Sequence, residues 1–179
     1  MRRLSVWSVV VLVVMLAVYF RTGQTPAGWT VFTNRAGWSI SYPPGWRISS
    51  CRSCPDPAEA GVFVNFFPSG NYNDGWVIVQ QLNRPSARTI DDSLLQLSNE
   101  VNLNPKLRQQ RILLNGHRAL LSLAQNPFGK SESETVYVVA GPQTFSISFV
   151  AFRGSALTQP NYHTYRQMLR TFRLANRPI

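Results

Sequence analysis

Apolar and polar residues alternate along most of the chain after residue 29, with the period of a strand that is buried on one side. This pattern predicts strands over residues 29–34, 38–42, 46–48, 61–67, 76–82, 107–114, 117–125, 135–140 and 143–152. The Asn115-Gly116 pair between two of them is typical of a two-residue hairpin turn. Tight turns join neighbouring strands, so we expect an antiparallel sheet.

Two other segments repeat their apolar residues at helical spacing. The first begins at Thr89 and stops at Asn104-Pro105, with an apolar stripe of Ile90, Leu94, Leu97 and Val101. The second begins at Pro160 and runs to about Leu174, with Tyr165, Met168, Leu169 and Phe172 facing inward. Because both helices need an apolar surface to cover, the predicted class is α+β, an antiparallel β-sheet covered by helices.

The amino terminus has a different pattern. Arg2 and Arg3 precede an uncharged stretch of 17 residues, Leu4–Phe20, and Arg21 closes it. As a helix this stretch reaches about 25 Å, a little less than the hydrocarbon core of a bilayer. It predicts one transmembrane helix that acts as a signal anchor. The residues expected within this membrane span include Leu4, Trp7, Val11, Met15 and Phe20. A signal peptide that is removed near Thr25–Ala27 is the alternative.

Both alternatives export the rest of the chain, because the positive charge before the apolar stretch exceeds that after it. We therefore expect a single-pass protein of the cytoplasmic membrane, with its amino terminus inside and its domain on the extracytoplasmic side. The predicted organisation is an anchor over 1–21, a linker over 22–28, one domain over 29–175 and a tail over 176–179.

The chain has two cysteines, Cys51 and Cys54, in a CxxC arrangement. A four-ligand zinc site needs a second pair of ligands, and a thioredoxin-like centre needs the motif at the start of a helix. Pro55 and Pro57 follow instead, which is typical of a loop. In an oxidising compartment the pair predicts a small structural disulfide, with redox or metal chemistry as the alternative.

Basic residues outnumber acidic ones by 18 to 8, which gives a formal net charge of +10. Within the second predicted helix and just after it, arginines recur at intervals of 4, 3 and 4 residues: Arg166, Arg170, Arg173 and Arg177. They predict one basic helical face, either a solvated surface or a docking site. Its expected partner is a membrane protein complex with an acidic surface, or anionic lipid headgroups. Export argues against nucleic acid.

Three stretches resemble the PsbP-like family. Phe32–Trp46 is similar to its opening signature, in which a Gly-aromatic strand leads to Tyr-Pro and Trp. Ile112–Ala119 is similar to its mid-domain hairpin, and Tyr165–Phe172 to its closing helix. The resemblance covers residues 29–174 and consists mostly of turn and core residues, so it concerns the fold more than the function.

The resemblance implies an antiparallel sheet between helices, an α/β/α sandwich, in a family not known for enzymatic activity. The family's namesake is an extrinsic subunit of photosystem II, and other bacterial members look like exported or membrane-tethered proteins. This chain departs from the namesake in its predicted membrane span and in the Cys51–Cys54 pair. No metal ligand can be carried over, and no cofactor is expected.

Candidate catalytic groups are few. Among the eight carboxylates, Asp91, Asp92 and Glu100 are assigned to the first helix, and Glu132 and Glu134 to a loop beside the start of a strand. No nucleophile elbow, phosphate loop or zinc-protease motif occurs. The sequence therefore predicts a non-enzyme, an accessory or assembly subunit of a larger membrane complex. The alternative is a thiol-redox or metal-handling protein that uses Cys51 and Cys54, and a third possibility is a small-molecule binder with a pocket lined by exposed tryptophans.

Overall fold

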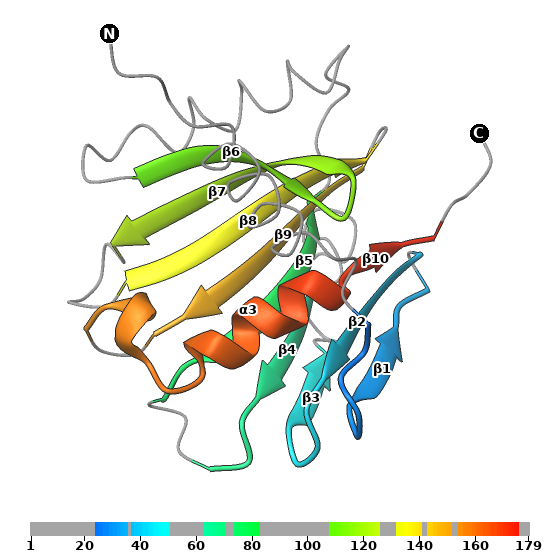
Figure 1. Ribbon diagram of the computed structural model, residues 1–179, viewed down its shortest axis with the longest axis vertical. Coiled ribbons are helices and arrows are strands. Elements are labelled where there is room, and N and C mark those ends of the chain that lie inside the picture. Colours follow the sequence, from blue (N-terminus) through cyan, green and yellow to red (C-terminus); the bar gives the residue numbers. More distant parts are fainter. Residues whose placement is uncertain are drawn as a thin grey trace, which may run out of the picture.

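The computed structural model describes residues 24–35, 37–50, 63–70, 74–82, 108–125, 132–140, 143–151 and 154–175. In this part of the chain the strands form two sheets, and every strand pair is antiparallel (Figure 1). The small sheet has the order β1-β2-β10, and the large sheet has the order β3-β4-β5-β9-β8-β7-β6. The antiparallel architecture predicted from the alternation of apolar and polar residues is confirmed.

The small sheet contains β1 (Thr30–Thr33), β2 (Trp38–Tyr42) and β10 (Arg173–Leu174). The large sheet contains β3 (Arg47–Ser50), β4 (Phe63–Phe67), β5 (Trp76–Leu82), β6 (Arg108–Leu114), β7 (His117–Gln125), β8 (Glu132–Ala140) and β9 (Gln143–Val150). A 3-10 turn, η2 (Ala156–Thr158), precedes the helix α3 (Tyr162–Thr171).

The strand predictions agree with the structure to within a few residues, and the largest difference is at β8. This strand begins at Glu132 and not at residue 135, since Glu132 pairs with Gln125 of β7. The first predicted helix, over residues 89–104, lies outside the described residues. Of the two helices expected to cover the sheet, the described residues therefore contain one, α3.

Helix α3 ends earlier than predicted. The sequence placed its end near Leu174, but the helix stops at Thr171 because Phe172 is extended, with φ −61° and ψ 130°. The chain then joins the small sheet as β10, where Arg173 pairs with Ser39 and Leu174 with Trp38. Pairing with β2 gives the backbone of these residues partners that another helical turn would otherwise supply.

The β6–β7 hairpin turns at Asn115-Gly116, as the sequence predicts. Asn115 has φ 50° and Gly116 has φ 85°, the left-handed values that a type I′ turn requires at both positions. The resulting register pairs Leu114 with His117 and Leu113 with Arg118. The tip of this hairpin extends to the carboxyl-terminal end of α3 (Figure 1).

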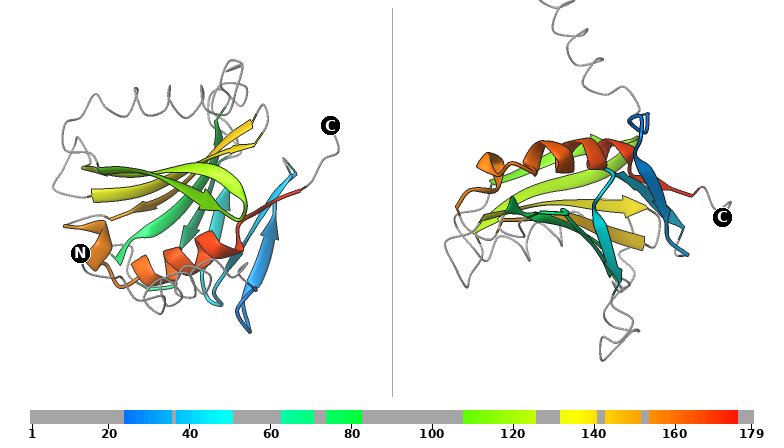
Figure 2. Two further views of the ribbon diagram at one scale, coloured as in Figure 1. Left: turned by 45° about the horizontal axis from the view of Figure 1, so that its top comes forward. Right: turned by 90° about the horizontal axis from the view of Figure 1, so that it is seen from below.

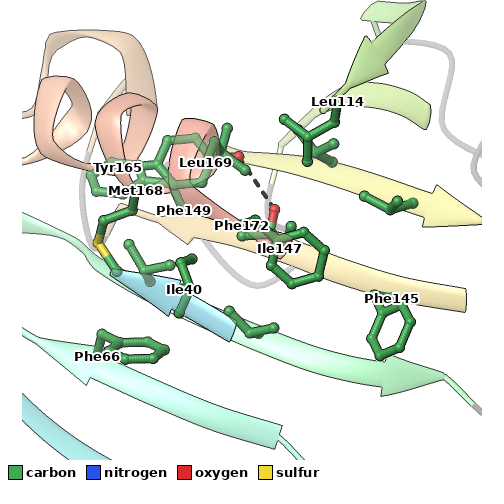
Figure 3. Packing of buried hydrophobic residues seen from close by; sticks show 14 of the residues in the cluster. Ile40, Phe66, Leu114, Phe145, Ile147, Phe149, Tyr165, Met168, Leu169 and Phe172 are labelled. Carbon is green, nitrogen blue, oxygen red and sulfur yellow. Dashed lines mark hydrogen bonds between the residues drawn. The ribbon is translucent and has the colours of Figure 1, made fainter. Parts of the chain in front are cut away.

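Helix α3 covers one face of the large sheet (Figures 1 and 2). Alternate residues of β9, namely Phe145, Ile147 and Phe149, are fully buried and pack with Tyr165 and Met168 of the helix, as Figure 3 shows. A buried side chain of this size contributes about 1.5–3 kcal/mol relative to an exposed one. This layer is the main core of the domain.

The small sheet closes the core at the other end of α3. Trp38 is 1% exposed, and its ring lies 6.1 Å from that of Phe172, the residue that ends the helix. Phe32 of β1 and Tyr42 of β2 both contact the ring of Phe66 in β4, at 5.7 Å and 5.5 Å between centroids. Aromatic packing therefore connects the small sheet to both the large sheet and the helix.

Candidate binding surface

The structure separates the arginines that the sequence placed on one helical face. Arg166 and Arg170 lie on α3, but Arg173 lies in β10, and Arg177 is outside the described residues. The continuous helical face over these four residues is therefore wrong, because the helix ends at Thr171. The two arginines on the helix also have different environments, and these environments identify the candidate surface.

Arg166, near the start of the helix, binds a carboxylate of the large sheet. Its Nη1 donates to Oε1 of Glu134 at 2.9 Å, and the Glu134 side chain is only 4% exposed. The hydroxyl of Tyr162 donates to the other oxygen, Oε2, at 2.7 Å. Both carboxylate oxygens of Glu134 are thus satisfied by side chains from α3.

Tyr165 completes this polar cluster from the core side. Its hydroxyl is fully buried and lies 3.3 Å from the carbonyl oxygen of Glu134 and 3.2 Å from that of Ile147, the contact dashed in Figure 3. Its proton is therefore shared between the backbones of β8 and β9. The cluster ties the first two turns of α3 to the middle of the large sheet.

The electrostatics of the cluster favour neutral tyrosines beside the ion pair. Burial and the hydrogen bond to Glu134 raise the pKa of Tyr162 to about 12. Burial, together with the Glu134 charge, raises the pKa of Tyr165 well above its usual value. Burial lowers the pKa of Arg166, but the Glu134 carboxylate more than offsets this, so the pKa is raised on balance. The two tyrosines therefore stay neutral and Arg166 stays positively charged at neutral pH, which suits a structural role.

Sequence reasoning missed Glu134 as a structural residue. A signal was present, since Glu134, Val136 and Val138 alternate along β8 and the two valines are fully buried. Strand periodicity therefore places the carboxylate on the face that α3 covers. The partner could not be identified from spacing, because Arg166 lies 32 residues away and reaches Glu134 only through the fold.

At the other end of α3, hydroxyl groups join the helix to the small sheet. Thr171 Oγ1 accepts a hydrogen bond from the buried backbone N–H of Ser41 at 2.8 Å and lies 2.8 Å from the Met168 carbonyl oxygen. The Oγ of Ser41 is in turn 2.9 Å from Oγ1 of Thr25. The chain therefore enters the domain beside the last turn of α3, within the segment that the sequence predicted as linker.

The β6–β7 hairpin reaches the same end of the helix. Asn115 Nδ2 donates to the carbonyl oxygen of Phe172 at 2.6 Å, across 57 residues of sequence. Arg173 Nη1 also donates to the Phe172 carbonyl, and to that of Arg170, both at 2.8 Å. A side-chain amide and a guanidinium thus satisfy carbonyl groups that a helix leaves without partners at its end.

This junction gathers positive charge. Arg170 is exposed on the last turn of α3, and Arg173 beside it is partly exposed. Arg118 is exposed too, but it alternates with the buried Ala119 and so lies on the face of the sheet away from α3. We call Arg170 and Arg173, together with the hairpin tip at Asn115, the arginine corner. The two segments that form it, 108–125 and 162–175, contain six arginines and neither Asp nor Glu. All the described residues together contain eight arginines and three carboxylates, a net charge of +5.

The remaining predicted site residues, Cys51, Cys54 and the apolar residues from Leu4 to Phe20, lie outside the described residues. Within the described ranges, no group of three or more His, Cys, Asp or Glu side chains is placed to hold a metal ion. A search of the same ranges finds no helix with the length and hydropathy needed to cross a membrane. The disulfide and the membrane anchor remain predictions.

Comparisons with known proteins find matches among solved structures. No protein-family model matches the sequence, and no curated protein does. The solution structure of cyanobacterial PsbP (CyanoP) from Synechocystis matches with a TM-score of 0.56 and 12% identity over 83% of this chain and 93% of that one. A crystal structure from Bacteroides thetaiotaomicron matches with a TM-score of 0.54 and 15% identity over 85% of this chain.

The chain spans 50% of the length of the Bacteroides protein and nearly all of the cyanobacterial one. At these identities the similarity concerns the fold and not the function. It agrees with the resemblance given by the opening strand pair, the Asn115-Gly116 hairpin and the closing helix, all of which the structure contains. The domain therefore has the PsbP-like fold.

Proposed function

We propose that this protein is a membrane-anchored binding module on the extracytoplasmic side of the cytoplasmic membrane. It acts as an accessory or assembly subunit of a larger membrane protein complex and works by binding, not by catalysis. The observation that carries the proposal is the arginine corner, where Arg170 and Arg173 lie beside a hairpin tip and neither contributing segment contains a carboxylate. Arginine suits a binding role of this kind because its guanidinium can form paired hydrogen bonds to carboxylates or phosphates.

The Glu134 cluster supports this proposal by contrast. Its carboxylate is buried, both of its oxygens accept hydrogen bonds from α3, and its tyrosines hold their protons at neutral pH. A general acid or base needs a pKa near the working pH and access to a substrate. The cluster is thus suited to fixing the helix, which in turn holds Arg170 and Arg173 at the corner.

The anchor makes a weak interface sufficient. A domain attached to the membrane by residues 4–20 meets a membrane partner at a high effective concentration, so modest affinity gives stable association. Because Thr25 already contacts Ser41, only residues 21–24 separate the domain from the predicted span, and so short a segment keeps the domain near the membrane.

The test is purification of the full-length protein from its native membranes in mild detergent, followed by mass spectrometry of what remains bound. We expect one defined membrane complex in stoichiometric amount, and a marked loss of it with Arg170→Glu. Arg47→Glu, a charge reversal on the exposed first residue of β3, is the matched control and should retain the complex. Recovery of the protein alone, without its first 27 residues, would contradict both the anchor and the accessory role.

A further inference from the structure

The chain enters the domain beside the outer face of the small sheet. Thr25 Oγ1 lies 2.9 Å from the Oγ of Ser41 in β2, and Ser41 is only 2% exposed. In the register of the small sheet Ser41 is opposite Val31 of β1, so their side chains are neighbours on one face. That face is the outer one, because Phe32 and Ile40, which alternate with Val31 and Ser41, pack into the core. Thr25 and Val31 are therefore both next to Ser41.

The chain doubles back between Thr25 and Val31. The N–H of Trp29 donates to the carbonyl oxygen of Pro26 at 3.1 Å, and Gly28 has φ 80°, a left-handed value that suits glycine. This turn brings β1 alongside the residues by which the chain entered. In the right-hand view of Figure 2, the first described residues (dark blue) lie next to the end of α3 and to β1, on the same side of the large sheet as the helix.

The short connection to the predicted anchor limits how far this face can be from a bilayer. The predicted span ends at Phe20, five residues before Thr25, and five residues reach at most about 18 Å even when fully extended. The headgroup layer itself occupies about 5–7 Å beyond the hydrocarbon core. Since Val31 and Thr25 are both next to Ser41, an anchored domain holds the outer face of the small sheet close to the headgroups.

The composition of the small sheet suits contact with lipid. Val31 is 54% exposed, and Thr30 and Thr33 of the same strand are exposed as well. A single exposed valine is ordinary on a protein surface, so it is the place of Val31 beside the chain entry that gives its exposure a meaning. The three strands of the small sheet and residues 24–29 before them contain neither Asp nor Glu. The small sheet therefore has no carboxylate that lipid phosphates would repel.

We propose that the outer face of the small sheet rests on the lipid bilayer, with Val31 among the headgroups. The partner is the bilayer surface itself, which meets a short apolar contact flanked by the hydroxyl groups of Thr30 and Thr33. This inference rests on the proposed function, because the anchor must hold the sheet at the membrane. It adds the orientation of the domain: the face of the large sheet away from α3, where Leu113 lies, is directed away from the bilayer.

The experiment uses the full-length protein in phosphatidylcholine nanodiscs, with and without a nitroxide quencher attached to the lipid headgroups. A small fluorescent amino acid replaces Val31, Leu113 or Leu157 in three separate variants. These residues are the exposed large hydrophobic side chains in the described part of the chain, and their exposed fractions are similar, at 54%, 55% and 47%. The variants at 113 and 157 are thus matched controls for the one at 31. Thermal unfolding of each variant shows whether its domain is folded.

We expect the headgroup quencher to remove most of the emission at position 31 and clearly less of it at 113 and 157. Val31 is next to the chain entry, and Leu113 faces away from α3. Leu157 precedes the start of α3, whereas the chain entry lies beside the last turn of this ten-residue helix. Discs without the quencher give the reference emission for each position.

The outcomes separate this inference from the proposed function. Retention in the discs with stronger quenching at 113 or 157 than at 31 keeps the anchor and overturns the contact through the small sheet. Equal quenching at all three positions, or at none, also overturns this contact, because the domain would then have no preferred face or would lie clear of the bilayer. Failure of the protein to remain in the discs overturns the anchor, and with it the membrane contact of the small sheet.

Discussion

The two ends of helix α3 use arginine in opposite ways. At the first end, Arg166 binds the buried carboxylate of Glu134, and two tyrosines complete its surroundings. At the last end, Arg170 and Arg173 lie beside a hairpin whose segment, residues 108–125, contains no carboxylate. The helix is only ten residues long, so an arginine bound to a buried carboxylate and an arginine exposed on the surface lie within about 15 Å of each other.

The comparison teaches that the opposing sheet decides the role of a helical arginine. Strand β8 presents Glu134 on the covered face at one end of the helix. The hairpin instead presents the amide of Asn115 to the helix carbonyls at the other end. Arg166 and Arg170 look equivalent in sequence, but substitution of the first should affect stability and substitution of the second should affect binding. The following predictions test the contacts at each end of the helix.

Removal of the carboxylate should have the largest effect on stability. Glu134→Ala leaves the Tyr162 hydroxyl and Arg166 without their acceptor, and we expect the free energy of unfolding to fall by about 2–3 kcal/mol. The estimate allows for Arg166 being 37% exposed. Denaturant titration measures the loss, and Glu132→Ala on the same strand serves as the control. An equal effect of both variants would show that the cluster adds nothing.

Removal of the Thr171 hydroxyl, at the last turn of α3, should have the next largest effect on stability. Thr171→Val leaves the buried N–H of Ser41 without its acceptor, at an expected cost of about 1–3 kcal/mol. Thr164→Val is a matched control on the same helix, because threonine and valine have similar helix propensities. If urea midpoints of the two variants coincide, the contact between α3 and β2 is not stabilising.

Alkaline pH should weaken the first end of the helix. The pKa of Tyr162 is raised to about 12 in the folded protein, above its ordinary value of 10.0, so the unfolded chain loses this proton first. Stability from this group is therefore complete below pH 10 and lost as pH rises toward 12. Unfolding measured across this range should show a steeper decline for the wild type than for Tyr162→Phe. Parallel curves would argue against the raised pKa.

The bond from the hairpin to the helix should have the smallest of these effects. Asn115→Gly keeps the left-handed turn but removes the donor to the Phe172 carbonyl, and we expect a loss of about 1 kcal/mol. Asn115→Ala should cost more, since alanine disfavours the φ of 50°. Thermal midpoints that rank the two variants in the reverse order would contradict this role of Asn115.

Much of the fold was predictable because its signals are local. Alternation along β4, β5, β7 and β9, and the Asn115-Gly116 turn, depend on neighbours in sequence. The end of α3 could not be predicted in this way. Phe172 is extended, and the next two residues, Arg173 and Leu174, pair with β2. No property of these residues alone indicates that β2, near the start of the domain, needs a partner.

The candidate surface was predicted only in part. The sequence identified Arg170 and Arg173 as candidates, but it grouped them with Arg166, whose partner comes from another strand. It also missed Asn115 as a partner of the helix end, since the hairpin meets the helix only in three dimensions. The structural role of Arg166 and the contact of the hairpin with the helix end both depend on residues far apart in sequence, which is why the sequence did not predict them.

The most direct test exchanges one arginine at each end and measures two properties. Arg166→Gln should lower the free energy of unfolding by about 1–2 kcal/mol and leave the association of the folded protein with its membrane complex unchanged. Arg170→Gln should change stability by less than about 0.5 kcal/mol and weaken association. If instead both variants affect stability and association alike, the two ends of α3 do not have separate roles, and the arginine corner is not the binding surface.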